Sequence, residues 1–326
     1  MDTTSYYIGI DIGGTKCAVL AGKEDMEILE RIEFPNETDR GAAYMLEKLI
    51  ETTASILNTY SEMKIKAIGI SCGGPLDSKK GIIQSPPNLP GWDNIEIIRI
   101  FKERFSIPCF IQNDANACAL AEWKFGAGKG TSNMVFLTFG TGLGAGLIID
   151  GRLYSGTNDN AGEVGHIRLD EDGPVGYNKA GSFEGFCSGS GITRLAQIMA
   201  RKKIANGESV SYCETEQDLD TITTKKLAEL ANGGDKDALE VFEISAKKLG
   251  TGLSIIIDVL NPERIVIGSV YARNPHLFLP HAMEVIEKEA LAGAWGVCEI
   301  VPAALGEVVG DYASLSVAIA GYAELK

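Results

Sequence analysis

Strand-like and helix-like stretches alternate along the chain. Short apolar runs predict strands over residues 6–10, 17–21, 28–34, 65–71, 108–112, 133–139, 145–150, 264–267 and 298–302. Mixed apolar and polar stretches predict helices over residues 41–60, 115–126, 192–203, 224–231, 236–260, 280–292 and 308–322, with the fifth interrupted at Gly250 and Gly252. This order is typical of an α/β protein whose mixed sheets are covered by helices.

Two of the predicted strand pairs are joined by a glycine-rich turn. The first reads IGIDIGGTKCAVLAG and the second MVFLTFGTGLGAGLIID, so the same unit opens each half of the chain. Glycine permits a positive φ and has no Cβ that would block a ligand. One such turn is an ordinary hairpin feature. Two such turns, each with adjacent hydroxyl groups, predict that the backbone of both turns binds one phosphorylated ligand.

Two other phosphate-binding motifs fit the chain poorly. A P-loop needs GxxxxGK[ST], and the nearest segment, GAGKGTS at 126–132, has a different spacing. A dinucleotide fingerprint opens a helix. Here the alternating glycines from Gly140 to Gly146 lead into LIID, a strand. The remaining interpretation is that backbone N–H groups of Gly13, Gly14, Gly140 and Gly142 hold phosphate oxygens.

Length, charge and cysteine usage narrow the class of protein. The 326 residues are enough for about two domains, and no apolar run approaches a membrane span. The N-terminal residues lack the basic region of a signal peptide. The formal net charge of −14 argues against a general nucleic-acid binder. Seven cysteines without CxxC spacing indicate reduced thiols in a cytoplasmic protein.

Five motifs in order carry a family resemblance that covers nearly the whole chain. DIGGTK, GGPLD with PNLPGW, NDANA, LTFGTGLGAG with AGEVGH, and IVIGS follow one another as in the ROK family of sugar kinases and repressors. The chain therefore resembles a ROK protein. The resemblance implies a two-lobed, actin-like ATPase (ribonuclease H-like) α/β fold. It also implies a smaller lobe of residues 1–115 plus about 309–326, a larger lobe of 116–308, and a ligand cleft between them.

The resemblance implies an ATP- and Mg²⁺-dependent kinase that phosphorylates a hexose hydroxyl, in the manner of a glucokinase. Asp114 would be the general base, although the Asn113–Asp114 pair could equally cap a helix. The expected sugar-binding residues are Gly74, Asn88, Asn113, Asp114, Glu163, His166 and Glu184. The expected ATP-binding residues are Asp11, Gly13, Gly14, Thr15, Lys16, Thr138, Gly140, Thr141, Gly142 and Gly268, with Asp11 facing Mg²⁺ through water.

One segment departs from the family pattern. Many ROK members have CxCGxxGCxE, whose three cysteines bind zinc together with the histidine of the GH motif. This chain has VGYNKAGSFE, with Val175, Tyr177 and Ser182 at the cysteine positions. These side chains cannot replace three thiolates. We therefore predict no zinc, a histidine free to bind sugar, and a 173–185 loop held by packing around Tyr177 and Phe183.

Several alternatives stay open at this point. A kinase for fructose, N-acetylmannosamine or N-acetylglucosamine fits the motifs equally well. A catalytically silent sugar sensor is a rival, which the retained Asp11, Thr15, Asp114 and Thr141 disfavour. A DNA-binding repressor is disfavoured because only seven residues precede Ile8 and because the chain is acidic. The resemblance also implies a homodimer.

Overall fold

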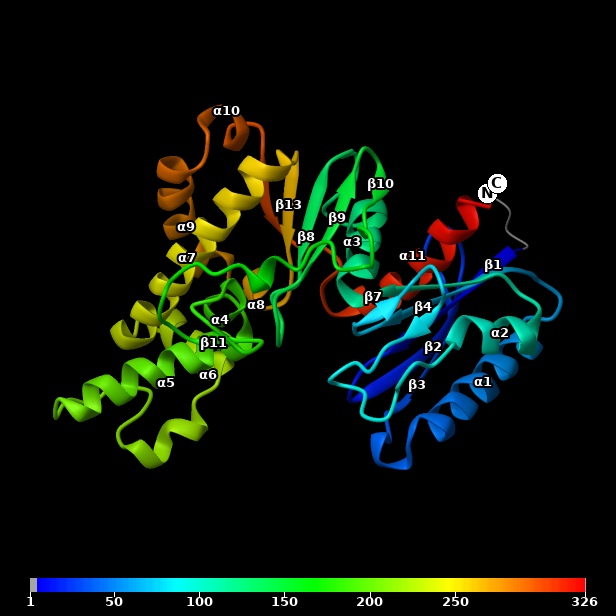
Figure 1. The fold of residues 1–326 in the computed structure, drawn as a ribbon, viewed down its shortest axis with the longest axis horizontal. Coiled ribbons are helices and arrows are strands. Elements are labelled where there is room, and N and C mark those ends of the chain that lie inside the picture. Colours follow the sequence, from blue (N-terminus) through cyan, green and yellow to red (C-terminus); the bar gives the residue numbers. More distant parts are fainter. Residues whose placement is uncertain (1–4, 326) are drawn as a thin grey trace.

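A computed structural model describes residues 5–325 of the chain, arranged as two lobes that each contain a five-stranded sheet. Figure 1 shows the lobes side by side, with both described chain ends in the first lobe. Residues 1–4 and 326, which belong to the expected domain ranges, lie outside the described residues. No helix in the range 5–325 has the length and apolar character needed to cross a membrane.

The first sheet has the strand order β3-β2-β1-β4-β7. Its strands are β1 (Ser5–Ile12), β2 (Lys16–Gly22), β3 (Ile28–Pro35), β4 (Lys64–Cys72) and β7 (Cys109–Asn113). The first three pair antiparallel, whereas β1, β4 and β7 run parallel. Residues of β1 and β4 are buried on both faces, which explains their continuous apolar runs.

The second sheet repeats this topology in the order β10-β9-β8-β13-β14. Its strands are β8 (Met134–Leu137), β9 (Ala145–Ile149), β10 (Arg152–Leu153), β13 (Arg264–Ile267) and β14 (Glu299–Pro302). Again three strands pair antiparallel, here β10, β9 and β8, and β8, β13 and β14 run parallel. The repeat of strand, glycine turn and strand predicted from the sequence is thus confirmed, and each glycine turn connects the first two strands of its sheet.

Helices cover both faces of the sheets. In the first lobe, α1 (Ala42–Thr59) and α2 (Ile97–Phe105) bury one face. The helix α11 (Val309–Ala323) covers the opposite face, and α3 (Asp114–Phe125) packs against both α11 and the second sheet. The layer of α3 and α11 therefore lies between the two sheets. The sequence patterns had assigned no helix to residues 97–105.

Close packing under α11 depends on small residues. A Cβ added to Gly69 would lie 2.2 Å from the backbone nitrogen of Ala318, and one on Gly9 would lie 2.4 Å from Ser314 Oγ. Both glycines are in central strands, directly beneath the helix. The small residues Ser314 and Ala318 of α11 therefore lie at close-packing positions.

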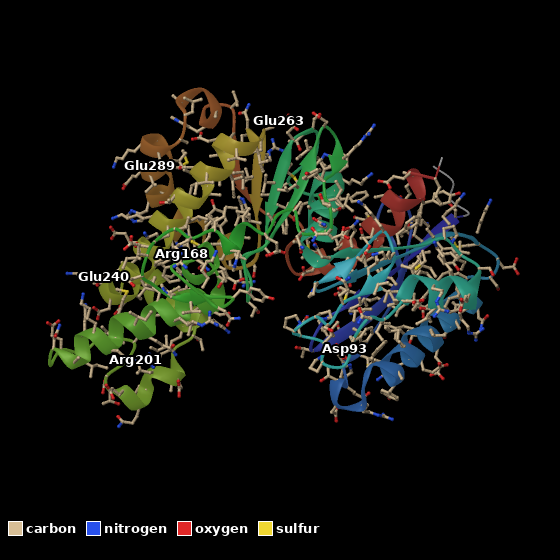
Figure 2. The ribbon with its side chains drawn as sticks, viewed as in Figure 1. Asp93, Arg168, Arg201, Glu240, Glu263 and Glu289 are labelled. Carbon is tan, nitrogen blue, oxygen red and sulfur yellow. The ribbon has the colours of Figure 1, made fainter. Side chains whose placement is uncertain are left out.

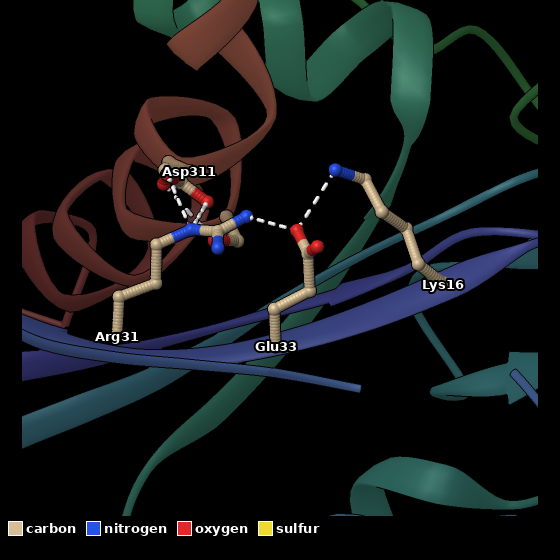
Figure 3. A network of polar contacts seen from close by, with 5 residues as sticks. Lys16, Arg31, Glu33 and Asp311 are labelled. Atoms are coloured by element: carbon tan, nitrogen blue, oxygen red, sulfur yellow. Dashed lines mark hydrogen bonds and ion pairs between the residues drawn. The ribbon is translucent and has the colours of Figure 1, made fainter. Parts of the chain in front are cut away.

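A polar network joins the same C-terminal helix to the edge of the first sheet (Figure 3). Arg31 Nε on β3 donates to both carboxylate oxygens of Asp311, at 2.9 and 2.8 Å. Its Nη2 donates to Glu33 at 2.6 Å, and Lys16 Nζ reaches the same carboxylate at 2.8 Å. The start of α11 is thus tied to β2 and β3, close to the first glycine turn.

The remaining helices belong to the second lobe and cover the other face of its sheet. They are α4 (Phe183–Phe186), α5 (Gly189–Ala205), α6 (Thr224–Asn232), α7 (Lys236–Leu260), α8 (Ser269–Arg273), α9 (Pro275–Glu289) and α10 (Ala292–Trp295). Figure 2 shows charged side chains such as Arg201 and Glu240 pointing away from this lobe. Short elements complete the chain: β5 (Leu76–Asp77), β6 (Ile82–Ile83), β11 (Val175–Gly176), β12 (Lys179–Ala180), and the 3₁₀ turns Thr38–Arg40, Val164–His166, Glu216–Thr221 and Gly306–Val308.

Two predicted helices differ from the observed ones. The helix α7 is continuous, so the predicted interruption at Gly250 and Gly252 is wrong. These glycines instead allow close contacts, because added Cβ atoms would lie 2.6 Å from Ala282 O and 2.3 Å from the Phe183 ring. The helix α9 begins at Pro275, five residues before its predicted start, because proline is well suited to the first turn.

Candidate active site

A cleft of about 800 Å³ opens between the lobes, and both glycine turns line it. The first turn contributes Gly14 and Thr15, and the second contributes residues from Thr138 to Ala145. All seven expected sugar-binding residues line the same cleft, namely Gly74, Asn88, Asn113, Asp114, Glu163, His166 and Glu184. The tertiary structure thus brings the two turns and the polar residues between them into a single site.

The backbone of the two glycine turns is not left-handed at the glycines expected to hold phosphate. None of the glycines from Gly140 to Gly144, nor Gly13 or Gly14, has a positive φ. A Cβ on Gly14 would lie 2.9 Å from Asn88 O, and one on Gly142 would lie 2.7 Å from Glu184 Oε2. Glycine is needed at these two positions because other parts of the chain approach closely, whereas the sequence argument invoked a positive φ or room for a ligand.

Asn113 and Asp114, at the start of α3, have different surroundings. The Asn113 side chain caps the helix by accepting from Asn116 N at 2.8 Å. Asp114 is open to the cleft, and its Oδ1 accepts from Ala115 N at 2.8 Å. The walls of the cleft partly desolvate this carboxyl, which raises its pKa. Capping thus accounts for Asn113 and leaves Asp114 available for chemistry.

A second group of polar side chains in the cleft comes from the second lobe. Glu184, on the short helix α4, accepts a hydrogen bond from Leu143 N at 3.0 Å. This bond joins one of the expected sugar-binding residues to the second glycine turn. Desolvation, with the nearby charges of Asp114 and Glu184, raises the pKa of Glu163, and His166 opposes that shift. These mutual effects show that the carboxylates and the imidazole converge on one region of the cleft.

Asp11 is the centre of an acidic cluster behind the first glycine turn. Burial, followed by repulsion from Asp311 and Asp114, raises the pKa of Asp11 to about 7, while Lys16 and Arg31 oppose the shift. No group of three or more metal-ligating side chains occurs among residues 5–325. A single carboxylate still suits Mg²⁺, which usually keeps several waters and takes further oxygens from substrate phosphates. A cation at Asp11 would also relieve the repulsion.

The other expected ATP-binding residues lie around the cleft or behind it. Thr15, Thr138, Gly140, Thr141 and Gly142 line it. Gly13 N donates to Lys16 O within the turn, at 3.0 Å. Lys16 is exposed and its ammonium pairs with Glu33, so it does not line the cleft. Gly268 is buried at the end of β13, next to a second hollow.

That second hollow, of about 330 Å³, adjoins the second glycine turn at Thr141. It is walled by the first residues of α5 and α8 and by α6, and its lining includes Ser190, Thr193, Thr224, Ser269 and Arg273. Sequence patterns did not single out these residues, because isolated serines and threonines on helices carry no spacing signal. Their hydroxyl groups extend the cleft beyond the glycine turn.

Asp159 is a further residue that the sequence did not indicate. Its carboxylate accepts from Ser78 N and from Ser78 Oγ, both at 2.7 Å. Ser78 follows β5 in the first lobe, whereas Asp159 precedes the Glu163 loop of the second. Both Asp159 and its neighbour Asn160 line the cleft. The hydrogen-bonded pair of Ser78 and Asp159 therefore links the two lobes beside the expected sugar-binding residues.

The 173–185 loop is organised differently from the expectation. Phe183 is buried, as predicted, but 70% of the Tyr177 surface is exposed, so packing around Tyr177 is wrong. Backbone carbonyls of the loop accept hydrogen bonds from basic side chains instead. Arg168 donates to Ala180 O at 2.7 Å and Arg194 donates to Val175 O at 2.8 Å. The Ser182 side chain caps α4.

Comparisons with known proteins bear on this site. The ROK family model matches residues 7–316. The chain belongs to the ROK family. A glucokinase of Halalkalibacterium halodurans is 30% identical over 309 residues, which cover 94% of this chain and 92% of that protein. The solved structure of a ROK family glucokinase from Streptomyces griseus in complex with glucose and AMPPNP is 28% identical, with a TM-score of 0.72 over 96% of this chain and 99% of that one.

The two-lobed, actin-like ATPase fold expected from the motifs is thereby confirmed. The family also contains regulators. A xylose repressor of Caldicellulosiruptor bescii is 32% identical to this ROK protein over 228 residues, which cover 69% of this chain and 55% of the repressor. Family membership alone therefore does not distinguish a kinase from a regulator. The residues of the site have to make that distinction.

Proposed function

We propose that this ROK protein is a sugar kinase that transfers the γ-phosphoryl group of ATP to a hexose hydroxyl, with Asp114 as the general base. Glucokinase relatives that match nearly the full length of the chain support the kinase assignment. The observation that carries the proposal is the placement of Asp114 in one cleft with both glycine turns. A sensor requires the sugar-binding residues, but it does not require a general base beside two phosphate-binding turns.

The proposed chemistry follows from the residues in the cleft. Backbone N–H groups of the glycine turns hold the phosphates, and Glu163, His166 and Glu184 orient the sugar through its hydroxyl groups. The Asp114 carboxylate takes the proton of the attacking hydroxyl. Its raised pKa makes it a stronger base than an ordinary aspartate at neutral pH. Mg²⁺ near Asp11 would supply neutralisation of the phosphate charge when bound.

The Asp114→Asn variant tests the proposal. The amide keeps the size of the side chain but cannot accept the proton, so kcat should fall by about 10²- to 10⁴-fold while glucose still binds. A coupled ADP-release assay over glucose, fructose, mannose and N-acetylhexosamines measures kcat, and calorimetry measures sugar binding. Asp220→Asn, an exposed aspartate outside the cleft, is the matched control. Near-normal turnover by Asp114→Asn would refute the mechanism.

The same assay distinguishes the rival functions. Turnover with fructose or an N-acetylhexosamine alone would change the substrate but keep the mechanism. Binding of sugar and ATP without turnover would identify a silent sensor. The wild-type rate should also fall as the pH drops through the raised pKa of Asp114, because only the carboxylate accepts a proton.

Other parts of the proposal concern the whole molecule. We infer two domains, residues 1–115 with 309–326 and residues 116–308, that close on the sugar and exclude water from the reaction. We also propose a cytoplasmic homodimer that does not bind nucleic acid. Light scattering of the purified protein tests the dimer, and a gel-shift assay with mixed duplex DNA tests the absence of DNA binding.

A further inference from the structure

The hairpin of β11 and β12 presents an aromatic side chain at its tip in an unfavourable backbone conformation. Tyr177 has φ +41° and Asn178 has φ +63°, both in the left-handed region. Asparagine tolerates this region, whereas a bulky residue such as tyrosine is seldom found there. The pairing of β11 with β12 leaves these two residues as a two-residue hairpin turn, and the type I′ form of that turn requires a positive φ at both positions.

Several contacts hold the strands of this hairpin in place. Lys179 Nζ, on β12, donates to His166 O at 2.7 Å, and Ser182 Oγ donates to Gly176 O at 3.3 Å. The hydrogen bonds from Arg168 (labelled in Figure 2) and Arg194 to the same hairpin hold its outer sides. The hairpin is therefore held in place, although Tyr177 at its tip is 70% exposed.

The fixed ring faces the sugar side of the cleft. Tyr177 lines the cleft, and its ring centroid lies 6.2 Å from that of His166 in an edge-on arrangement. His166 in turn lowers the pKa of Glu163, whereas Asp114 raises it, so Glu163 lies within the field of both. Asp114, Glu163, His166 and Tyr177 therefore line one cleft, and the Tyr177 ring lies beside His166.

We propose that Tyr177 is a specificity-determining residue that packs against an apolar face of the sugar beside His166. This inference rests on the proposed function. Sugars present apolar C–H faces between their hydroxyl groups, and an aromatic face excludes water from such a surface. His166 supplies the polar partner beside it. The position that holds a cysteine in many ROK members thus contacts substrate in this chain.

Tyr177→Gly is the informative variant, because glycine adopts the left-handed conformation without strain and removes the whole aromatic side chain. We expect the KM for the sugar to rise about tenfold, with kcat and the KM for ATP within twofold of wild type. Tyr177→Phe, which keeps the ring, should stay near wild type. Tyr154→Ala removes another tyrosine, 52% exposed and outside the cleft, and should change nothing.

Thermal unfolding of the same variants separates substrate contact from a structural role. The Tm of Tyr177→Gly should equal or exceed that of wild type. An unchanged sugar KM, an equal rise of the KM for sugar and ATP, or a lower Tm would overturn the inference. Its failure is distinct from failure of the proposed function, which would appear as the absence of sugar phosphorylation by the wild-type protein.

Discussion

Asp11→Asn should stabilise the ligand-free protein and at the same time impair its kinase activity. In the folded chain the pKa of Asp11 is raised to about 7 by burial and by the charges of Asp311 and Asp114. An unfolded aspartate has a pKa near 3.8. The folded state therefore binds more protons between these two values, and the free energy of unfolding decreases as the pH rises through this window.

The size of the effect follows from the shift. Each pKa unit corresponds to about 1.4 kcal/mol, so a shift of roughly three units gives an upper bound of about 4 kcal/mol above pH 7. Partial contact of Asp11 with solvent screens the repulsion, and we expect a gain of about 1–3 kcal/mol for the asparagine variant. At about 2–4 °C per kcal/mol, the Tm should rise by several degrees at pH 8.

Differential scanning fluorimetry of both proteins at pH 5 and pH 8 tests this expectation. The gain in Tm should be large at pH 8 and small at pH 5, where wild-type Asp11 is already protonated. Mg²⁺ with a non-hydrolysable ATP analogue should stabilise wild type more than the variant, because the carboxylate that would face the cation is absent. A gain that is equal at both pH values, or a less stable variant at pH 8, would refute the reasoning.

Two further predictions concern packing and metal content. Gly69→Ala should lower the free energy of unfolding by about 1–3 kcal/mol, measured by urea denaturation, because its Cβ would meet backbone atoms of α11. Gly293→Ala, which meets no atom within 4 Å, is its control, and equal stability of the two variants would contradict this account. Elemental analysis of the purified protein should find less than stoichiometric zinc, and EDTA should leave its Tm unchanged. Stoichiometric zinc would show that the altered loop still binds the metal.

Sequence patterns determined much of the fold because they are local. The two glycine turns and the apolar runs around them specify a strand pair at the start of each half, and the structure contains both pairs in identical topology. The sequence reasoning missed α2, although its buried residues Ile97, Ile98 and Phe101 are spaced for one helix face, and it failed in α7, where glycines serve packing. In α7, Gly250 and Gly252 meet distant residues that no local pattern reveals.

What the sequence alone could indicate was a list of candidate residues with motif-like spacing. Only the tertiary structure decided that seven of them line one cleft together with both glycine turns. It also decided that Lys16 pairs with Glu33 and that Asp159 accepts hydrogen bonds from Ser78. It also decided that Tyr177 faces the cleft. The reason is physical. Hydrophobic periodicity encodes which residues form each strand and helix, whereas side-chain convergence depends on contacts between segments far apart in the chain.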